Sequence, residues 1–292
     1  MLAEEIIQLM ESLFDPDQRK ILMRFFRTGK GQYGEGDEFL GLKVPVTRSI
    51  VKEVKLEEIT LEEIEKLLHS KWHEVRLCGF LLLVRLAESA AKELKSKSAT
   101  NKQSTTKGKK KSPKASSLQL PKLDEIVHFY LDRASCANNW DLVDLSTPRI
   151  VGLWLMTPTA ISPEEKLHTL DTLATSGDLW QQRIAMVSTW WTTRYGNPSY
   201  ALRYAEMLLN HPHDLMHKAV GWMLREVGKS TPTTPTYRGT KGIDLLREFL
   251  SQHVHEMPRT ALRYAIEKMD ERERKIWMER PVVTSVIGQE CH

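Results

Sequence analysis

A weak internal repeat restricts the possible fold of this 292-residue chain more than any other feature of its sequence. Three stretches beginning at residues 74, 181 and 216 align with one another, and each has a basic residue at the same place: Arg76, Arg183 and Lys218. The last two are 35 residues apart, which is the length of one helix pair in a helical-repeat protein. Such pairs stack into a curved solenoid, to which each repeat contributes one inner helix.

Helix signals occupy almost the whole chain, and no segment shows the alternation typical of a strand. Ser162 and Pro163, followed by two acids, are typical of a helix start, and Asn197 and Pro198 repeat this signal. Glycines stand where helices are expected to end, at Gly177, Gly196 and Gly228. We therefore expect an all-α protein, a right-handed α-solenoid whose repeated basic residues line a concave groove. An elongated polyanion such as DNA suits a groove of this kind.

The segment 95–121 differs in composition from the rest of the chain. Between Lys95 and Lys114 it holds eight lysines and no acid, so the remaining residues have a formal charge of about −4, against +4 for the whole. Its lack of apolar periodicity predicts a disordered insertion, either a solvated linker or a tether that attracts phosphates. We expect a single domain over residues 1–280, interrupted by this insertion, and a flexible C-terminal tail over 281–292.

Cysteine usage and hydropathy favour a cytoplasmic protein. The three cysteines are scattered and form no CxxC pair, which is typical of a reducing compartment and argues against both a disulfide framework and a zinc site. No run is long and apolar enough to span a membrane, and the first residues lack the basic start of a signal peptide. The stretch GKGQYG (residues 29–34) matches GxGxxG by letter, but it follows a helical pattern rather than a strand. We expect a monomer that binds no metal and no cofactor.

The predicted helix over residues 214–228 has two distinct faces when its residues are placed 100° apart. One face is an apolar stripe, made by Met216, Val220, Met223 and Val227. The opposite face carries Lys218, Trp222, Arg225 and Lys229. Because the core already has the apolar stripe, Trp222 lies among cations. It is either packed under the lysine stems or placed in a nucleic-acid groove, where it can stack.

The segment NNWDLVD, which ends at Asp144, is a second candidate site. Asn138 or Asn139 can cap a short helix, and Pro148 would then begin the next helix or kink this one. Trp140 and Asp144 are four residues apart, so they share a helix face. The same pattern also fits a capping asparagine, a core tryptophan and a surface acid.

Arg183 stands on a largely apolar helix face, with Leu179, Val187, Trp190 and Arg194 as its neighbours. An arginine in such surroundings must be paired or face a ligand, because an unpaired buried cation is costly. It is therefore either half of a structural ion pair, with Asp144 as one possible partner, or a contact to bound DNA.

At these residues the sequence resembles the AlkD-type DNA alkylation-repair glycosylases. The resemblance extends from about Arg24 to Asp270 and is interrupted by the lysine-rich insertion. Four stretches carry it, in the family's order: FLGLKVPVTR (39–48), NWDLVD (139–144), LWQQRIA (179–185) and KAVGWMLR (218–225). The resemblance implies a solenoid of HEAT-like helix pairs that wraps duplex DNA on its concave face.

Carried over residue by residue, the resemblance implies a catalytic aspartate at Asp144 and active-site tryptophans at Trp140 and Trp222. The family's tyrosine near the N-terminus falls on Phe25, which lacks the hydroxyl group, and the arginine of its DNA cleft falls on Arg183. Together with the basic row, the expected DNA contacts are Arg183, Lys218, Arg225, Arg76 and Phe25.

The implied activity is hydrolysis of the N-glycosidic bond of cationic N3- or N7-alkylated purines in duplex DNA. Such a base leaves in neutral form, so no general acid is required. A carboxylate can stabilise the positive charge that develops on deoxyribose and can orient water, and tryptophan faces can stabilise the same charge. An alternative is a non-catalytic HEAT-repeat protein that binds damaged or branched DNA without needing Asp144. A protein–protein scaffold would instead need an apolar concave face.

Overall fold

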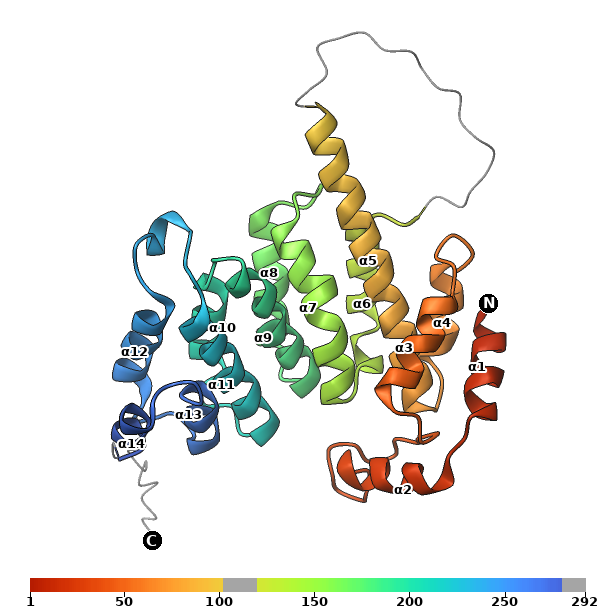
Figure 1. Cartoon of the computed structure of the whole chain (residues 1–292), viewed down its shortest axis with the longest axis horizontal. Coiled ribbons are helices and arrows are strands. Elements are labelled where there is room, and N and C mark those ends of the chain that lie inside the picture. The colour runs from red at the N-terminus through yellow and green to blue at the C-terminus, as the bar shows by residue number, and fades with distance from the viewer. Residues whose placement is uncertain (102–119, 280–292) are drawn as a thin grey trace, which may run out of the picture. The chain divides into compact units, whose positions relative to one another are not determined.

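The protein is all-helical. The computed structural model describes residues 1–101 and 120–279, and within these ranges the sole β pairing is an isolated bridge between Glu38 and Trp72 (Figure 1). The predicted all-α class is therefore confirmed. None of the described helices has both the length and the apolar character needed to cross a membrane. The helices up to the middle of the chain are α1 (Ala3–Ser12), α2 (Pro16–Phe25), α3 (Val44–Glu53), α4 (Leu61–Leu68), α5 (His73–Asn101), α6 (Leu123–Asp132), the 3₁₀ turn Ala134–Cys136, α7 (Trp140–Met156) and α8 (Pro163–Ala174).

The described chain forms two compact units, which divide between Leu167 and His168. In the first unit α5 packs against α3, α4, α6 and α7, and in the second α11 packs against α9, α10, α12 and α13. Helices thus contact mainly those one or two places away in chain order, which is the contact pattern of a helical-repeat protein. The sequence predicted one domain over the same span. The second unit contains α9 (Leu179–Arg194), α10 (Ser199–Met207), α11 (Asp214–Lys229), the 3₁₀ turn Pro235–Tyr237, α12 (Gly242–His253), α13 (Arg259–Ala265) and α14 (Glu271–Glu279).

Two helix starts lie where the sequence predicts them. The Ser162 hydroxyl accepts from the Glu165 amide at 3.2 Å, and the Glu165 carboxylate accepts from the Ser162 amide at 2.9 Å, so α8 begins with a reciprocal cap. The Asn197 side chain accepts from the first amide of α10 at 3.2 Å. Gly177 follows the end of α8 with φ of 75°, and Gly196 follows the end of α9 with φ of 90°.

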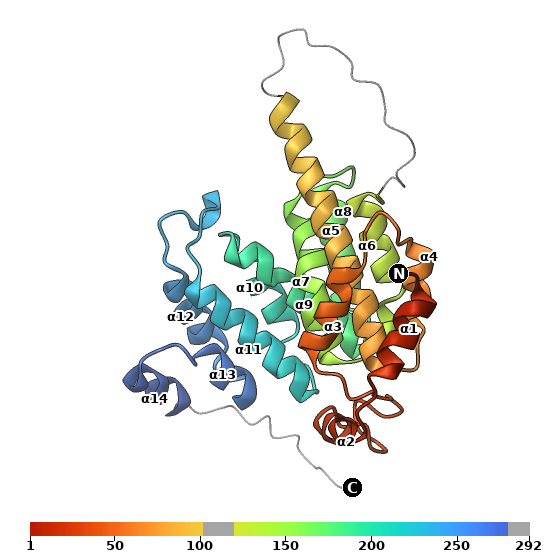
Figure 2. The same ribbon diagram turned by 45° about the vertical axis from the view of Figure 1, so that its right-hand side comes forward.

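The start of the lysine-rich segment is helical, which corrects the predicted disorder from residue 95 onward. Helix α5 continues to Asn101, and Figures 1 and 2 show it extending past the helices packed against it. The lysines between residues 92 and 97 are exposed straight-chain residues of high helix propensity, and Lys97 pairs with Glu93 one turn earlier. The rest of the predicted insertion, residues 102–119, and the predicted tail, residues 281–292, lie outside the described residues.

Helix α11 has the two faces predicted for it. The apolar stripe is fully buried, at Met216, Val220, Met223 and Val227. On the other side Lys218, Trp222 and Arg225 are half-buried and Lys229 is exposed. Gly221 lies where α11 touches α13, and a Cβ atom there would come within 2.3 Å of the Ala261 carbonyl oxygen. The close packing of these two helices therefore requires glycine at this position.

Candidate active site

The helix that carries Trp140 and Asp144 is one continuous element. Asn139 caps α7 by accepting from the Trp140 amide at 2.9 Å, and the helix then continues through Pro148 instead of ending before it. Because proline has no N–H group, the helical hydrogen bond that would reach back to the Asp144 carbonyl is missing. Trp140 and Asp144 share one face of the first turns, as predicted.

An apolar pocket of about 420 Å³ brings these two residues together with Phe25. Its wall is formed by α2, by the chain that leads into α3, and by the first turns of α5 and α7. Phe25 is 61% exposed, and its ring centroid lies 5.9 Å from that of Trp140 in an edge-to-face arrangement. On the inner side the buried Phe26 ring stacks on Trp140 at 5.3 Å. Asp144 is thus a half-buried carboxylate beside aromatic rings.

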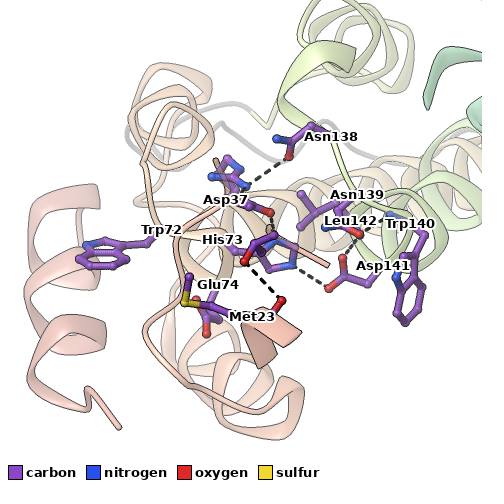
Figure 3. Close-up of polar contacts among 12 residues, drawn as sticks. Met23, Asp37, Trp72, His73, Glu74, Asn138, Asn139, Trp140, Asp141 and Leu142 are labelled. Atoms are coloured by element: carbon purple, nitrogen blue, oxygen red, sulfur yellow. Dashed lines mark hydrogen bonds and ion pairs between the residues drawn. The ribbon is translucent and has the colours of Figure 1, made fainter. Parts of the chain in front are cut away.

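Buried charged groups adjoin this pocket, and two of them, His73 and Asp141, line it. Figure 3 shows their polar contacts. The His73 ring lies between two carboxylates, with Nδ1 at 2.8 Å from Asp37 Oδ2 and Nε2 at 2.9 Å from Asp141 Oδ2. Arg76 donates to the other oxygen of Asp37 and also to Asn138. We call Asp37, His73, Arg76 and Asp141 the charge cluster. All four side chains are at most 9% exposed.

The charge cluster is electrically neutral when His73 is protonated. Burial by itself would lower the pKa of His73, but the charges of Asp141 and Asp37 and their hydrogen bonds raise it from 6.5 to about 9. Burial would raise the pKa of Asp37, yet its contacts with His73 and Arg76 hold it below 3.8. Two carboxylates therefore face one imidazolium and one guanidinium inside the protein.

Arg76 takes part in this cluster and does not lie on the protein surface. Its residue is 7% exposed, and besides Asp37 its guanidinium donates to the carbonyl oxygens of Ser70 and Lys71 at 3.0 and 3.2 Å. The sequence repeat predicts Arg76 in a basic row that contacts DNA. In the structure its polar contacts join the start of α5 to the loop before α7.

The stretch FLGLKVPVTR forms a second wall of the pocket and leads into α3. The buried Glu74 carboxylate accepts from the amides of Leu40, Gly41 and Leu42 at 2.9, 2.9 and 3.0 Å. Gly41 has φ of 91°, and a Cβ atom there would come within 2.2 Å of the Asp15 carbonyl oxygen. This glycine is therefore required where the chain passes between α2 and α5.

The second unit holds the other predicted contacts, and two of its cations already have acidic neighbours. Lys218 pairs with Asp214 at 2.7 Å, one turn earlier on α11, and Arg225 pairs with Glu267. Trp222 lies between these cations in sequence and is half-buried. The charges on this face of α11 are therefore partly balanced within the unit.

Arg183 is also buried, with 4% of its surface exposed. Its guanidinium donates to the carbonyl oxygen of Leu215, in the first turn of α11, and so links α9 to α11. This contact gives Arg183 a structural role within the second unit.

The charge cluster could not be predicted from the sequence, although the segments that flank it carry predicted site residues. Asp37 is 36 positions from His73, and Asp141 is 68 positions from it, so no local pattern connects them. A histidine at the start of a helix does not by itself indicate a buried charged site. Among the described residues, no group of histidine, cysteine and acidic side chains could hold a metal ion.

A helical-repeat protein with a carboxylate and aromatic rings at an apolar pocket is equipped to bind and stabilise a cationic, planar ligand. The chain matches the family model described as DNA alkylation repair enzyme over residues 6–269, and it belongs to that family. It is therefore a protein of alkylated-DNA repair. A comparison with curated proteins found no match.

Proposed function

We propose that this protein is a DNA glycosylase, which hydrolyses the N-glycosidic bond of cationic N3- or N7-alkylated purines in duplex DNA. One observation carries the proposal: Asp144 and Trp140 project from one face of α7 and line the same apolar pocket as Phe25. Membership in the alkylation-repair family supports it. Asp144 is the proposed catalytic group.

The chemistry asks little of the protein beyond electrostatic stabilisation. An alkylated purine leaves as a neutral base, so the transition state contains a sugar with positive character and an incoming water molecule. The Asp144 carboxylate stabilises that sugar and orients the water. Apolar surroundings strengthen its effect because they lower the local dielectric constant.

Aromatic side chains supply the second part of the site. Trp140 and Phe25 present ring faces and edges at the pocket, where they can stack on a nucleotide or stabilise the cationic sugar. The resemblance also assigns Trp222 to the active site, and we keep it there as part of the proposal. Phe25 provides the ring of the family's tyrosine without its hydroxyl group.

Phosphate contacts of the first unit are expected from α2, from α3 and from the chain between them. Arg24, Arg27, Lys43 and Arg48 are exposed and make no ion pair with any described residue, and Lys43 lines the pocket itself. Such cations can release counterions from DNA. Lys218, Arg225 and Arg183 remain the candidates from the second unit. We propose that the protein acts as a cytoplasmic monomer on duplex DNA.

The direct test is incubation of the protein with a duplex that contains 7-methylguanine. We expect release of free 7-methylguanine, measured by chromatography, and an abasic site that alkali converts into a strand break. A duplex without protein corrects for spontaneous depurination, and an undamaged duplex shows whether release is specific.

The same experiment distinguishes the alternative. Tight binding to the damaged duplex with no release above the spontaneous rate would contradict the glycosylase proposal. It would favour a non-catalytic helical-repeat protein that binds damaged or branched DNA.

A further inference from the structure

The charge cluster connects three separate parts of the first unit at one imidazole ring. Asp37 belongs to the chain between α2 and α3, His73 begins α5, and Asp141 lies in the first turn of α7. Figure 3 shows the ring of His73 between the two carboxylates, with Trp140 next to Asp141. Resting on the proposed function, we propose that His73 is a positioning residue, which as an imidazolium holds the first turn of α7 so that Trp140 and Asp144 are placed for base excision.

The hydrogen bond from His73 to Asp141 contacts α7 directly. Asp141 accepts from His73 through Oδ2 and from the Leu142 amide through Oδ1 at 2.9 Å. Its carboxylate is thus fixed both to α5 and to the backbone of α7. Trp140 precedes it and Asp144 follows it within one turn, so a shift of Asp141 moves both.

Ring contacts also connect His73 to Trp140. The His73 ring stacks on Phe39 with a centroid distance of 4.4 Å and lies 5.0 Å from the ring of Phe26. Phe26 in turn stacks on Trp140. His73 therefore supports Trp140 through Asp141 on one side and through Phe26 on the other.

Protonation decides whether this support is present. A neutral His73 would leave Asp37 with Arg76 as its partner, while the buried Asp141 would lose its cation. An uncompensated buried carboxylate is strongly unfavourable, so the first turn of α7 would have to move or admit water. The other charged groups that line the pocket with His73 are Lys43, Glu74 and Asp144. Of these, Glu74 is bound to three backbone amides.

The first test compares His73→Gln with His128→Gln, since His128 is exposed on α6 and serves as a matched control. At a temperature where both variants are folded, we expect His73→Gln to lower the single-turnover rate of base release on the order of tenfold to a hundredfold. Its dissociation constant for the damaged duplex should change less than about twofold. Equal rates in the two variants would overturn the proposal.

The second test is the pH dependence of base release in the wild type and in Asp141→Asn. The pKa of His73 is about 9, so the rate of base release by the wild type should not vary with pH near neutrality. The rate should fall above pH 9, where His73 loses its proton. Asp141→Asn removes the buried carboxylate that needs a cation, and it leaves Asp37 and Arg76 as a balanced pair. Deprotonation of His73 then leaves no uncompensated charge, so the decline above pH 9 should be absent from the variant. An unchanged profile would overturn the proposal even if His73→Gln fails to fold.

A third measurement needs no activity and so separates this proposal from the proposed function. Hydrogen exchange of the amides in residues 140–143 should be at least about tenfold faster in His73→Gln than in His128→Gln at the same pH. If the wild type releases no base, the glycosylase proposal fails. The exchange rates still test whether His73 holds the first turn of α7. Equal exchange in both variants would show that His73 does not hold this turn.

Discussion

Helices α7 and α11 each carry a tryptophan of the proposed site, but the buried contacts near these two tryptophans differ in kind. In α11 the apolar stripe through Met223 is fully buried, and the polar face of the same helix carries Trp222. In α7 the first turn carries Asp141, which binds a histidine on another helix. We therefore attribute the position of Trp222 to hydrophobic burial of α11, and, on the proposal above, that of Trp140 to buried charge pairing. The two should therefore respond differently to mutation and to pH.

The largest expected effect comes from breaking the charge cluster. Arg76→Met keeps much of the side-chain volume but leaves Asp37 without its guanidinium, so we expect a loss of about 3–5 kcal/mol in the free energy of unfolding. Urea denaturation would measure it. Arg48→Met, on the exposed face of α3, is the control and should change stability by less than about 0.5 kcal/mol. A similar small change in both variants would show that the cluster contributes little.

The apolar stripe of α11 should give the next largest effect. Met223 is fully buried, so Met223→Ala removes packed atoms and leaves a cavity. We expect a loss of about 2–5 kcal/mol, seen as a lower denaturant midpoint with an unchanged slope. Base release per folded molecule should stay near the wild-type value. A loss of activity without a loss of stability would contradict this assignment.

Changes of pH should separate the two helices. The pKa of His73 is about 9 in the folded protein and 6.5 in an ordinary histidine, so folding favours the protonated form. Its contribution is fully present below pH 6.5 and is lost as pH rises toward 9. The shift corresponds to about 3 kcal/mol at 1.4 kcal/mol per unit.

The check is to measure the stability of the wild type minus that of His73→Gln from pH 6 to pH 10. The difference should shrink with rising pH, while the stability loss of Met223→Ala should stay constant. A difference that does not vary with pH would mean that His73 is neutral in the folded protein.

The smallest stability effect is expected at Trp222. Its ring is half-buried and lies on the helix face opposite the apolar stripe, so Trp222→Ala should cost less than about 1 kcal/mol. We expect weaker DNA binding or slower excision instead, measured by titration and by base release. If Trp222→Ala proves more destabilising than Met223→Ala, then this tryptophan belongs to the core.

The two helices also show which features can be predicted from the sequence. The two faces of α11 could be predicted because helical periodicity is a local property, and the caps of α8 and α10 could be predicted for the same reason. The pairing of Trp140 with Asp144 also follows from their spacing on one helix. Each of these predictions depends on residues within a few turns of one another.

The role of Arg76 could not be predicted in this way. The repeat assigned it to a basic row on a DNA-binding face, because the sequence shows its charge but not its partner. Its partner Asp37 lies 39 positions away, in the chain between α2 and α3. Alignment of basic residues across repeats therefore predicts position on a helix, and burial decides what each cation contacts.

The proposed activity depends most directly on the carboxylate of Asp144. The decisive measurement is single-turnover release of 7-methylguanine by Asp144→Asn, compared with Asp132→Asn, which removes the same charge from the exposed end of α6. We predict that Asp144→Asn still binds the damaged duplex but releases base about a hundredfold more slowly, a loss of about 3 kcal/mol in transition-state stabilisation. Asp132→Asn should match the wild type. Release by Asp144→Asn at close to the wild-type rate would contradict the catalytic assignment.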